Sequence, residues 1–165
     1  MVSITKRSEE MIKKSIVALL FLISLTAYSQ QIATCRAPAG KAYYHFDGLV
    51  NEARAGWSDD KISGGVFSLS KIKEDTFDIL YIDIQNKPIS STQDGAIVRL
   101  IRSGPNILTL LVFYPSATTE IYSFFKEKDG RYRFSMMQNK TGAGAMIPKS
   151  SLMVGDCDPI RFDLQ

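Results

Sequence analysis

The stretch "ILTLLVFYPSATTEIYSFFKEKDGRYRFSMMQ", residues 107–138, decides the fold class. Residues 107–114 are almost continuously apolar, which is typical of a strand covered on both faces. Asp129 and Gly130 then separate two further strand-like runs, and Asp-Gly between such runs is a strong β-hairpin signal. After this turn, aromatic and apolar residues alternate with arginine and serine, as on a strand with one buried face. The stretch therefore predicts consecutive antiparallel strands.

The rest of the chain repeats this pattern of short β-forming runs separated by turns. Residues 76–84 and 95–103 are rich in β-forming residues and end at turn-like sequences. The shorter candidate strands are residues 41–46, 64–70 and 151–155, and one short helix is expected near 48–55. We therefore predict an all-β fold, a mostly antiparallel meander of about eight strands, arranged as a small barrel or a sandwich, with the barrel favoured.

The N-terminal residues have the pattern of a secretory signal peptide. Two lysines precede the apolar run 15–27, and small side chains follow at the positions that a signal peptidase reads. The run is too short for a membrane span, which needs about 20 apolar residues. We therefore expect residues 1–29 to be removed, with Met11 as an alternative start. Residues 30–165 then form a single exported domain, periplasmic or secreted, without a membrane span.

The chain has two cysteines, Cys35 and Cys157. Oxidised thiols persist outside the cytosol, so export favours one disulfide between them. The alternatives are free thiols, a lipid anchor on Cys35 and a metal site. The apolar run does not lead directly into Cys35, which disfavours the anchor, and two cysteines with one histidine are few ligands for zinc. We expect a disulfide that ties the end of the domain to its beginning, and no metal or cofactor.

The charge of the exported domain is close to neutral. Removal of residues 1–29 takes away four of the 20 basic and two of the 17 acidic residues, which lowers the net charge from +3 to +1. Nucleic-acid partners require a marked excess of basic residues. We therefore expect no nucleic-acid partner.

His45 is the only histidine, and Asp47 follows it two positions later. Residues two apart on a strand share a face, so Asp47 is in place to orient an imidazole that acts as a base. A serine would complete a hydrolase triad, but no Gly-x-Ser-x-Gly motif singles one out. The simpler interpretation is a partly buried strand histidine that hydrogen-bonds to the backbone.

The loop-like stretch "GWSDDKISGG", residues 56–65, holds the only tryptophan, Trp57, followed by Asp59 and Asp60. As a binding loop it would present Trp57 as a stacking surface beside the two carboxylates. The alternating acidic pattern of a calcium loop is absent. The simpler interpretation is that Trp57 anchors the loop in the core, while the aspartates are solvated turn residues.

The sequence therefore favours a non-catalytic binding or interaction protein. Its expected partner is a small hydrophobic ligand held in the barrel, or a secreted or envelope protein. The alternative is a secreted hydrolase that uses His45 and Asp47. A hollow interior would favour small-molecule binding, and a filled interior would favour recognition at the surface.

Overall fold

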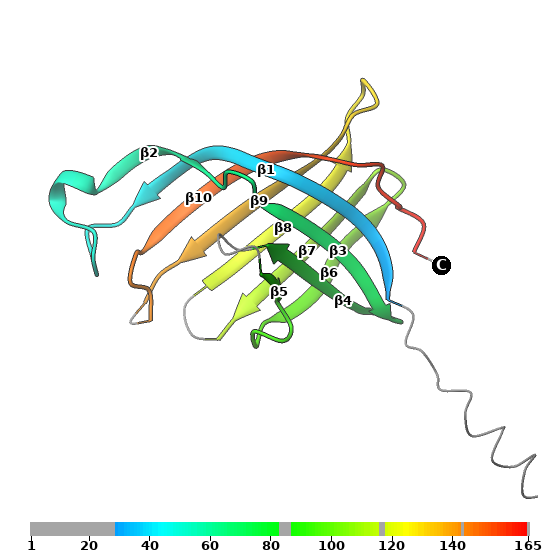
Figure 1. Ribbon diagram of the computed structural model, residues 1–165, viewed down its shortest axis with the longest axis horizontal. Helices are drawn as coiled ribbons and strands as arrows, with labels where there is room; N and C mark the ends of the chain where they lie inside the picture. The colour runs from blue at the N-terminus through cyan, green and yellow to red at the C-terminus, as the bar shows by residue number, and fades with distance from the viewer. Residues whose placement is uncertain (1–28, 83–86, 116–117, 143, 165) are drawn as a thin grey trace, which may run out of the picture.

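The chain folds into one antiparallel sheet that curls into a half-barrel (Figure 1). The computed structural model describes residues 29–82, 87–115, 118–142 and 144–164, so most of the predicted signal peptide lies outside the described residues. The prediction of an all-β, antiparallel fold is confirmed. The strands are β1 (Gln30–Tyr44), β2 (Gly56–Lys61), β3 (Val66–Lys73), β4 (Thr76–Ile82), β5 (Pro88–Ser90), β6 (Ile97–Gly104), β7 (Ile107–Tyr114), β8 (Thr118–Lys126), β9 (Tyr132–Lys140) and β10 (Lys149–Cys157).

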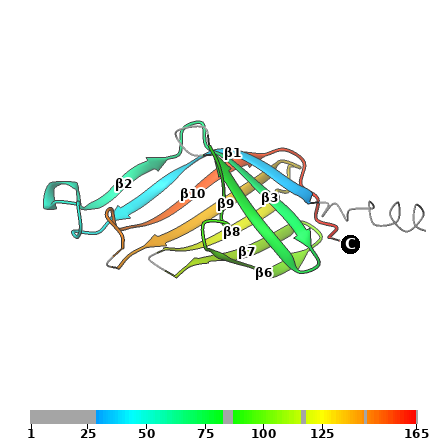
Figure 2. The same cartoon turned by 60° about the horizontal axis from the view of Figure 1, so that its bottom comes forward.

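The order of strands across the sheet explains the curl. The order is β5-β4-β3-β1-β10-β9-β8-β7-β6, with β2 paired to β1 off this path. Strands from β6 to β10 therefore follow one another as a meander, and the first long strand closes onto the last. β4 also contacts β6 at the other end of the order, so the two ends of the curled sheet lie near each other, with no pairing between their described residues, and Figure 2 shows the curvature that brings them together.

The long first strand serves two partners because it bends in the middle. Residues 30–36 pair with β3, and residues 39–44 pair with β2, while β10 runs along both parts. At the bend the register against β10 shifts, and Ala37 has a positive φ of 47°. Pro38 follows and has no N–H to donate, which suits a bulge. The sequence predicts only residues 41–46 as strand, because Pro38 and Gly40 resemble strand breakers.

The predicted short helix is present as a single 3-10 turn, Glu52–Arg54, within the expected region. The side chain of Asn51 caps it by accepting a hydrogen bond from the backbone N–H of Arg54 at 3.1 Å. The stretch after this turn, expected to be a loop, begins with strand β2 instead. This strand forms because it pairs with β1, and the polar sequence of β2 alone does not predict it.

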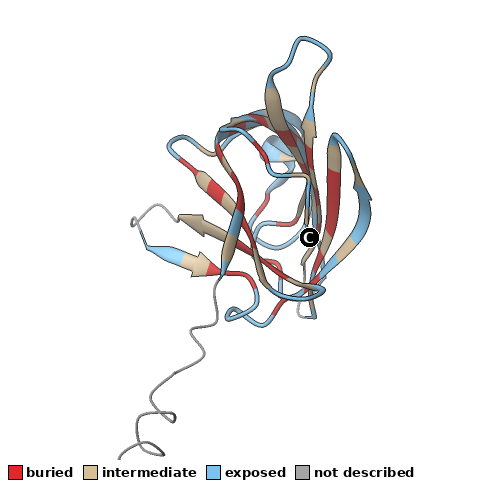
Figure 3. Ribbon diagram, turned by 90° about the vertical axis from the view of Figure 1, so that its right-hand side faces the viewer, coloured by how far each residue is buried: buried red, intermediate tan, exposed pale blue. Residues whose placement is uncertain are grey.

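The apolar core lies on the concave side of the sheet, where buried positions recur along the strands (Figure 3). At one end of the half-barrel this interior is filled by side chains with no exposed surface: Cys35, Leu69, Leu108, Phe124 and Phe134. The chain after β10 covers this end, with the ring of Phe162 stacked on Tyr132 at a centroid distance of 6.3 Å. We refer to it as the closed end.

Candidate functional site

The inward side chains of β8 and β9 form successive levels from the closed end towards the opposite, open end. The inward cross-strand pairs are, in this order, Phe124–Phe134, Tyr122–Met136, Glu120–Gln138 and Thr118–Lys140. The first pair is fully buried in the core. The other three pairs line a cavity of about 650 Å³, hereafter the cup. The interior is thus filled at one end and hollow at the other.

The lining of the cup combines aromatic rings with a few charged groups. Apolar and aromatic surface broken by a small number of placed polar groups is typical of small-molecule sites. The aromatic lining residues are Tyr44, Phe67, Tyr81, Tyr114 and Tyr122, and the charged ones are Asp94, Glu120, Lys140 and Lys149.

Glu120 lies inside the cup with only 7% of its surface exposed. Its Oε1 accepts a hydrogen bond from Gln138 Nε2 at 2.7 Å, and its Oε2 accepts one from the hydroxyl of Tyr122 at 2.9 Å. Burial raises the pKa of Glu120 above its usual value, and the two hydrogen bonds offset only part of this effect. Burial and the charge of Glu120 also raise the pKa of Tyr122, which keeps that hydroxyl a neutral donor.

Hydrogen bonds among buried polar groups fix the turn after β5, which contacts Tyr114 in the lining of the cup. The side chain of Asp78 accepts hydrogen bonds from Ser90 Oγ at 2.6 Å and from the backbone N–H of Thr92 at 3.0 Å. These bonds fix the turn after β5, whose Ser91 accepts a hydrogen bond from the Tyr114 hydroxyl at 3.1 Å. Burial raises the pKa of Tyr114, so this phenol stays protonated.

Asp60, one of the predicted site residues, contacts the lining of the cup through Lys149. Its carboxylate forms an ion pair of 2.6 Å with Lys149, and the two side chains are only 13% and 20% exposed. The Lys149 ammonium also lies 5.8 Å from the ring centroid of Tyr44, within cation–π range. Asp60 is therefore a half-buried ion-pair partner on a strand, and its prediction as a solvated turn residue is wrong.

Trp57 and Asp59 lie on the opposite face of β2 from Asp60, because side chains alternate along a strand. Trp57 is 75% exposed, so the expectation that it anchors a loop in the core is wrong. Its ring packs edge-on against Tyr43 with centroids 5.5 Å apart. Asp59 pairs with Lys41 at 2.6 Å on the same outer surface, and this hydrogen bond and charge lower the pKa of Asp59.

The two predicted catalytic candidates are not joined in the described part of the chain. His45 lies just after β1, not on a strand, and its Nε2 is 3.1 Å from Ser150 Oγ on β10. The Asp47 carboxylate instead accepts a hydrogen bond from the backbone N–H of Gly48 at 2.8 Å. Ser150 donates to the Asn139 side chain at 2.8 Å, so its proton does not point at the imidazole.

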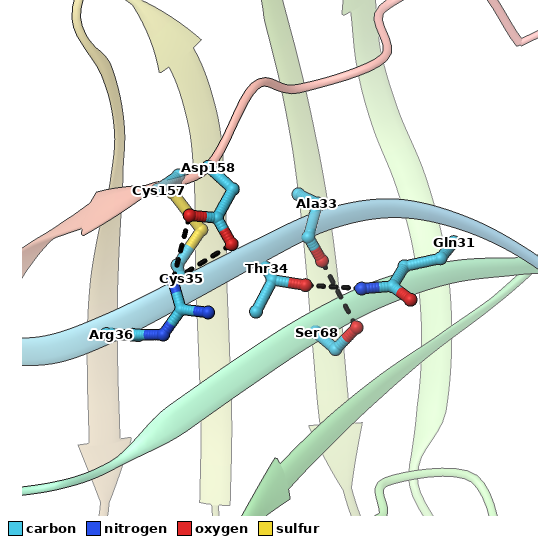
Figure 4. Close-up of polar contacts among 8 residues, drawn as sticks. All are labelled: Gln31, Ala33, Thr34, Cys35, Arg36, Ser68, Cys157 and Asp158. Atoms are coloured by element: carbon cyan, nitrogen blue, oxygen red, sulfur yellow. Dashed lines mark hydrogen bonds and ion pairs between the residues drawn. A yellow bond between two sulfur atoms is a disulfide. The ribbon is translucent and has the colours of Figure 1, made fainter.

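The predicted disulfide between Cys35 and Cys157 is present, with its sulfur atoms 1.97 Å apart (Figure 4). It joins residues that are paired across β1 and β10 at the closed end. Beside it, both carboxylate oxygens of Asp158 accept hydrogen bonds from one Arg36 guanidinium nitrogen at 2.9 Å. The disulfide therefore ties the two ends of the domain together, far along the strands from the cup.

The sequence alone does not identify three residues of the cup as site residues: Glu120, Gln138 and Tyr122. One sequence signal points to Glu120. It alternates with the outward residues of 118–124 on the same face as Tyr122 and Phe124, and it is the only charged residue on that face. Among the described residues, no group of three or more histidine, cysteine, aspartate or glutamate side chains is placed to hold a metal ion. The described part of the chain also contains no helix long and apolar enough to cross a membrane.

Comparisons with protein-family models, with curated proteins and with solved structures find no match to this chain. The geometry of the cup is therefore the basis for any functional conclusion.

Proposed function

We propose that this protein is an exported, non-catalytic binding protein that holds a small organic ligand in the cup. The observation that carries the proposal is a cavity of about 650 Å³ at the open end of an otherwise filled half-barrel. Ligand sites typically have volumes of about 300–1,000 Å³ and a mainly apolar lining with few polar groups. The volume of the cup lies within that range, and its lining combines five aromatic rings with four charged side chains.

The proposed location outside the cytosol has two supports. One is the signal-like pattern of residues 11–29, and the other is the disulfide between Cys35 and Cys157. Disulfides persist in secreted and periplasmic proteins and are rare in reducing compartments.

Two neighbouring residues on β8 provide a matched test of ligand binding. Thr118 faces the cup, whereas Thr119 is the next residue on the strand and faces the outer surface. The neutral fluorophore N-phenylnaphthylamine becomes brighter in an apolar site. We expect the wild-type protein and Thr119→Trp to bind it with similar affinity, and Thr118→Trp to lose binding because the indole occupies the mouth. Equal binding by the two variants would place the fluorophore outside the cup and defeat the proposal.

A secreted hydrolase is the second candidate, and its support is the distance of 3.1 Å between His45 Nε2 and Ser150 Oγ; a serine nucleophile there would first have to turn its proton from Asn139 to the imidazole. This serine lies 105 residues from the histidine in sequence, so no motif reveals the pair. An ester-hydrolysis screen with p-nitrophenyl acetate tests it. Activity that disappears in His45→Ala, while the variant remains folded, would replace the binding proposal with an enzymatic one.

A further inference from the structure

The carboxylate of Glu120 is buried and forms no ion pair, although the charge of Lys140, which also lines the cup, offsets part of the rise in its pKa. No lysine, arginine or histidine nitrogen in the described residues lies within 4.0 Å of its oxygens. Its two hydrogen bonds, from Gln138 and Tyr122, use one lone pair on each oxygen and leave acceptor capacity free. Buried charges are normally paired, so this carboxylate has an incomplete environment.

A second acceptor on the same level of the half-barrel is also incomplete. Ser151 pairs across the strands with Gln138, and it is only 7% exposed. Its Oγ has no hydrogen-bond partner among the described residues. The Ser151 hydroxyl can donate as well as accept, so the level of Glu120 has unused hydrogen-bonding capacity and no cationic side chain of its own.

The rings around Glu120 suit a cation. The charge of Glu120 raises the pKa of both Tyr114 and Tyr122, so both phenols lie close to the carboxylate. Tyr81 also raises the pKa of these two phenols and therefore lies near them. The faces of aromatic rings attract ammonium groups, and sites that combine several rings with a carboxylate recognise amines.

The overall charge of the site points in the same direction. Lys140 and Lys149 line the cup together with Asp94 and Glu120, and Lys149 is already paired with Asp60. The charged lining residues are two lysines and two carboxylates, and because Asp60 outside the lining neutralises Lys149, Lys140 alone remains to balance Asp94 and Glu120. An anionic ligand would increase this imbalance inside the cup, whereas a ligand with a single positive charge removes it.

We propose that the cup selects an organic cation, with its ammonium group against Glu120 and its apolar body between the tyrosine rings. This inference rests on the proposed function, because it requires that the cup binds a ligand. It adds the chemical class of that ligand and the residue that recognises it.

The test compares three probes that share one apolar body and differ in charge: phenylbutylamine, phenylbutanol and phenylbutanoate. Affinities are measured by calorimetry on the disulfide-bonded protein at neutral pH. We expect the amine to bind at least about tenfold more tightly than the alcohol, a difference equivalent to one ion pair with a cation–π contribution, and the acid to bind most weakly. In Glu120→Gln, which keeps the shape of the side chain, the amine should lose this advantage while the alcohol binds unchanged.

The control variant is Glu74→Gln, which removes the same charge from an exposed turn beyond β3, away from the cup. It should keep the preference for the amine. Equal binding of all three probes, or a preference for the acid, would overturn the inference and leave the proposed function standing. Binding of none of the probes would overturn both. An amine preference that persists in Glu120→Gln would also overturn the role of this residue.

The pH dependence of the wild-type protein gives a second readout that needs no variant to fold. The ionisable groups that line the cup together with Glu120 are Tyr44, Tyr81, Tyr114, Tyr122, Asp94, Lys140 and Lys149. As the pH falls through the raised pKa of Glu120, its carboxylate becomes neutral and the affinity for the amine should fall, while the affinity for the alcohol stays constant. The variant Asp94→Asn separates the contribution of the other carboxylate. An amine affinity that does not vary between mildly acidic and neutral pH would contradict the inference.

Discussion

Reduction of the disulfide should lower the free energy of unfolding by several kilocalories per mole. The bond joins residues with a sequence separation of 122, and in the chain-entropy model a loop of that length contributes about 4.9 kcal/mol at 25 °C. Structure that persists in the denatured state lowers the real value. The neighbouring ion pair between Arg36 and Asp158 is half exposed and compensates little. We therefore expect a loss of about 3–5 kcal/mol, or roughly 9–15 °C in Tm.

The assay is urea unfolding followed by circular dichroism, with and without a reductant. Alkylation and intact-mass analysis confirm that both thiols are free in the reduced sample. The midpoint should fall, and the slope m should rise because the unfolded chain without a crosslink exposes more surface. The double variant Cys35→Ala, Cys157→Ala is the control, since reductant should leave its unfolding curve unchanged.

An unchanged midpoint in a fully reduced sample would refute the reasoning. It would mean that structure that persists in the denatured state already restricts the chain as much as the covalent bond does.

Three further predictions concern charge and packing. Burial raises the pKa of Glu120 in the folded protein, so its protonation favours folding. In urea unfolding at several pH values, the wild type should lose stability relative to Glu120→Gln as the pH rises from the usual glutamate pKa through the raised one. Parallel plots of stability against pH for the two proteins would refute this. Double-mutant cycles should give a coupling of more than about 1 kcal/mol for the half-buried pair of Asp60 and Lys149, and a clearly smaller coupling for the solvent-exposed pair of Asp59 and Lys41. Similar couplings for the two pairs would show that burial does not decide the strength. Gly40→Ala should destabilise the protein by at least about 2 kcal/mol, because the added Cβ would lie 2.0 Å from the carbonyl oxygen of Leu152. Gly104→Ala, whose nearest contact is 3.4 Å away, should change the unfolding midpoint little.

The parts of the fold that the sequence predicts are those whose evidence is local. Strand β7 has the predicted bounds, and β8 and β9 lie on either side of the predicted Asp129–Gly130 turn, because apolar runs and an Asp-Gly turn are visible in consecutive residues. The first half of β1 and all of β2 are not predicted. Pro38 lies at a bulge, where no partner strand needs its missing N–H, so it does not end β1. Strand β2 forms through its hydrogen bonds to β1 and not through the β-propensity of its own residues.

The candidate site depends on contacts between distant residues, and for that reason the sequence reveals little of it. Glu120 and Gln138 meet only through the register of β8 against β9, and Asp60 reaches Lys149 across 89 positions. The disulfide is the exception, since two cysteines allow only one pairing whatever the fold.

The position of β2 off the main path of the sheet has a consequence for the behaviour of this protein in concentrated solution. Among the described strands, β2 pairs only with β1, so the backbone groups along its other side face outward and offer a template for the strand of another molecule. That strand carries Asp59, Asp60 and Lys61 in succession. A second copy docking along this edge would remove water from the exposed charges of Asp59 and Lys61, so this short charged run disfavours polymerisation through the sheet.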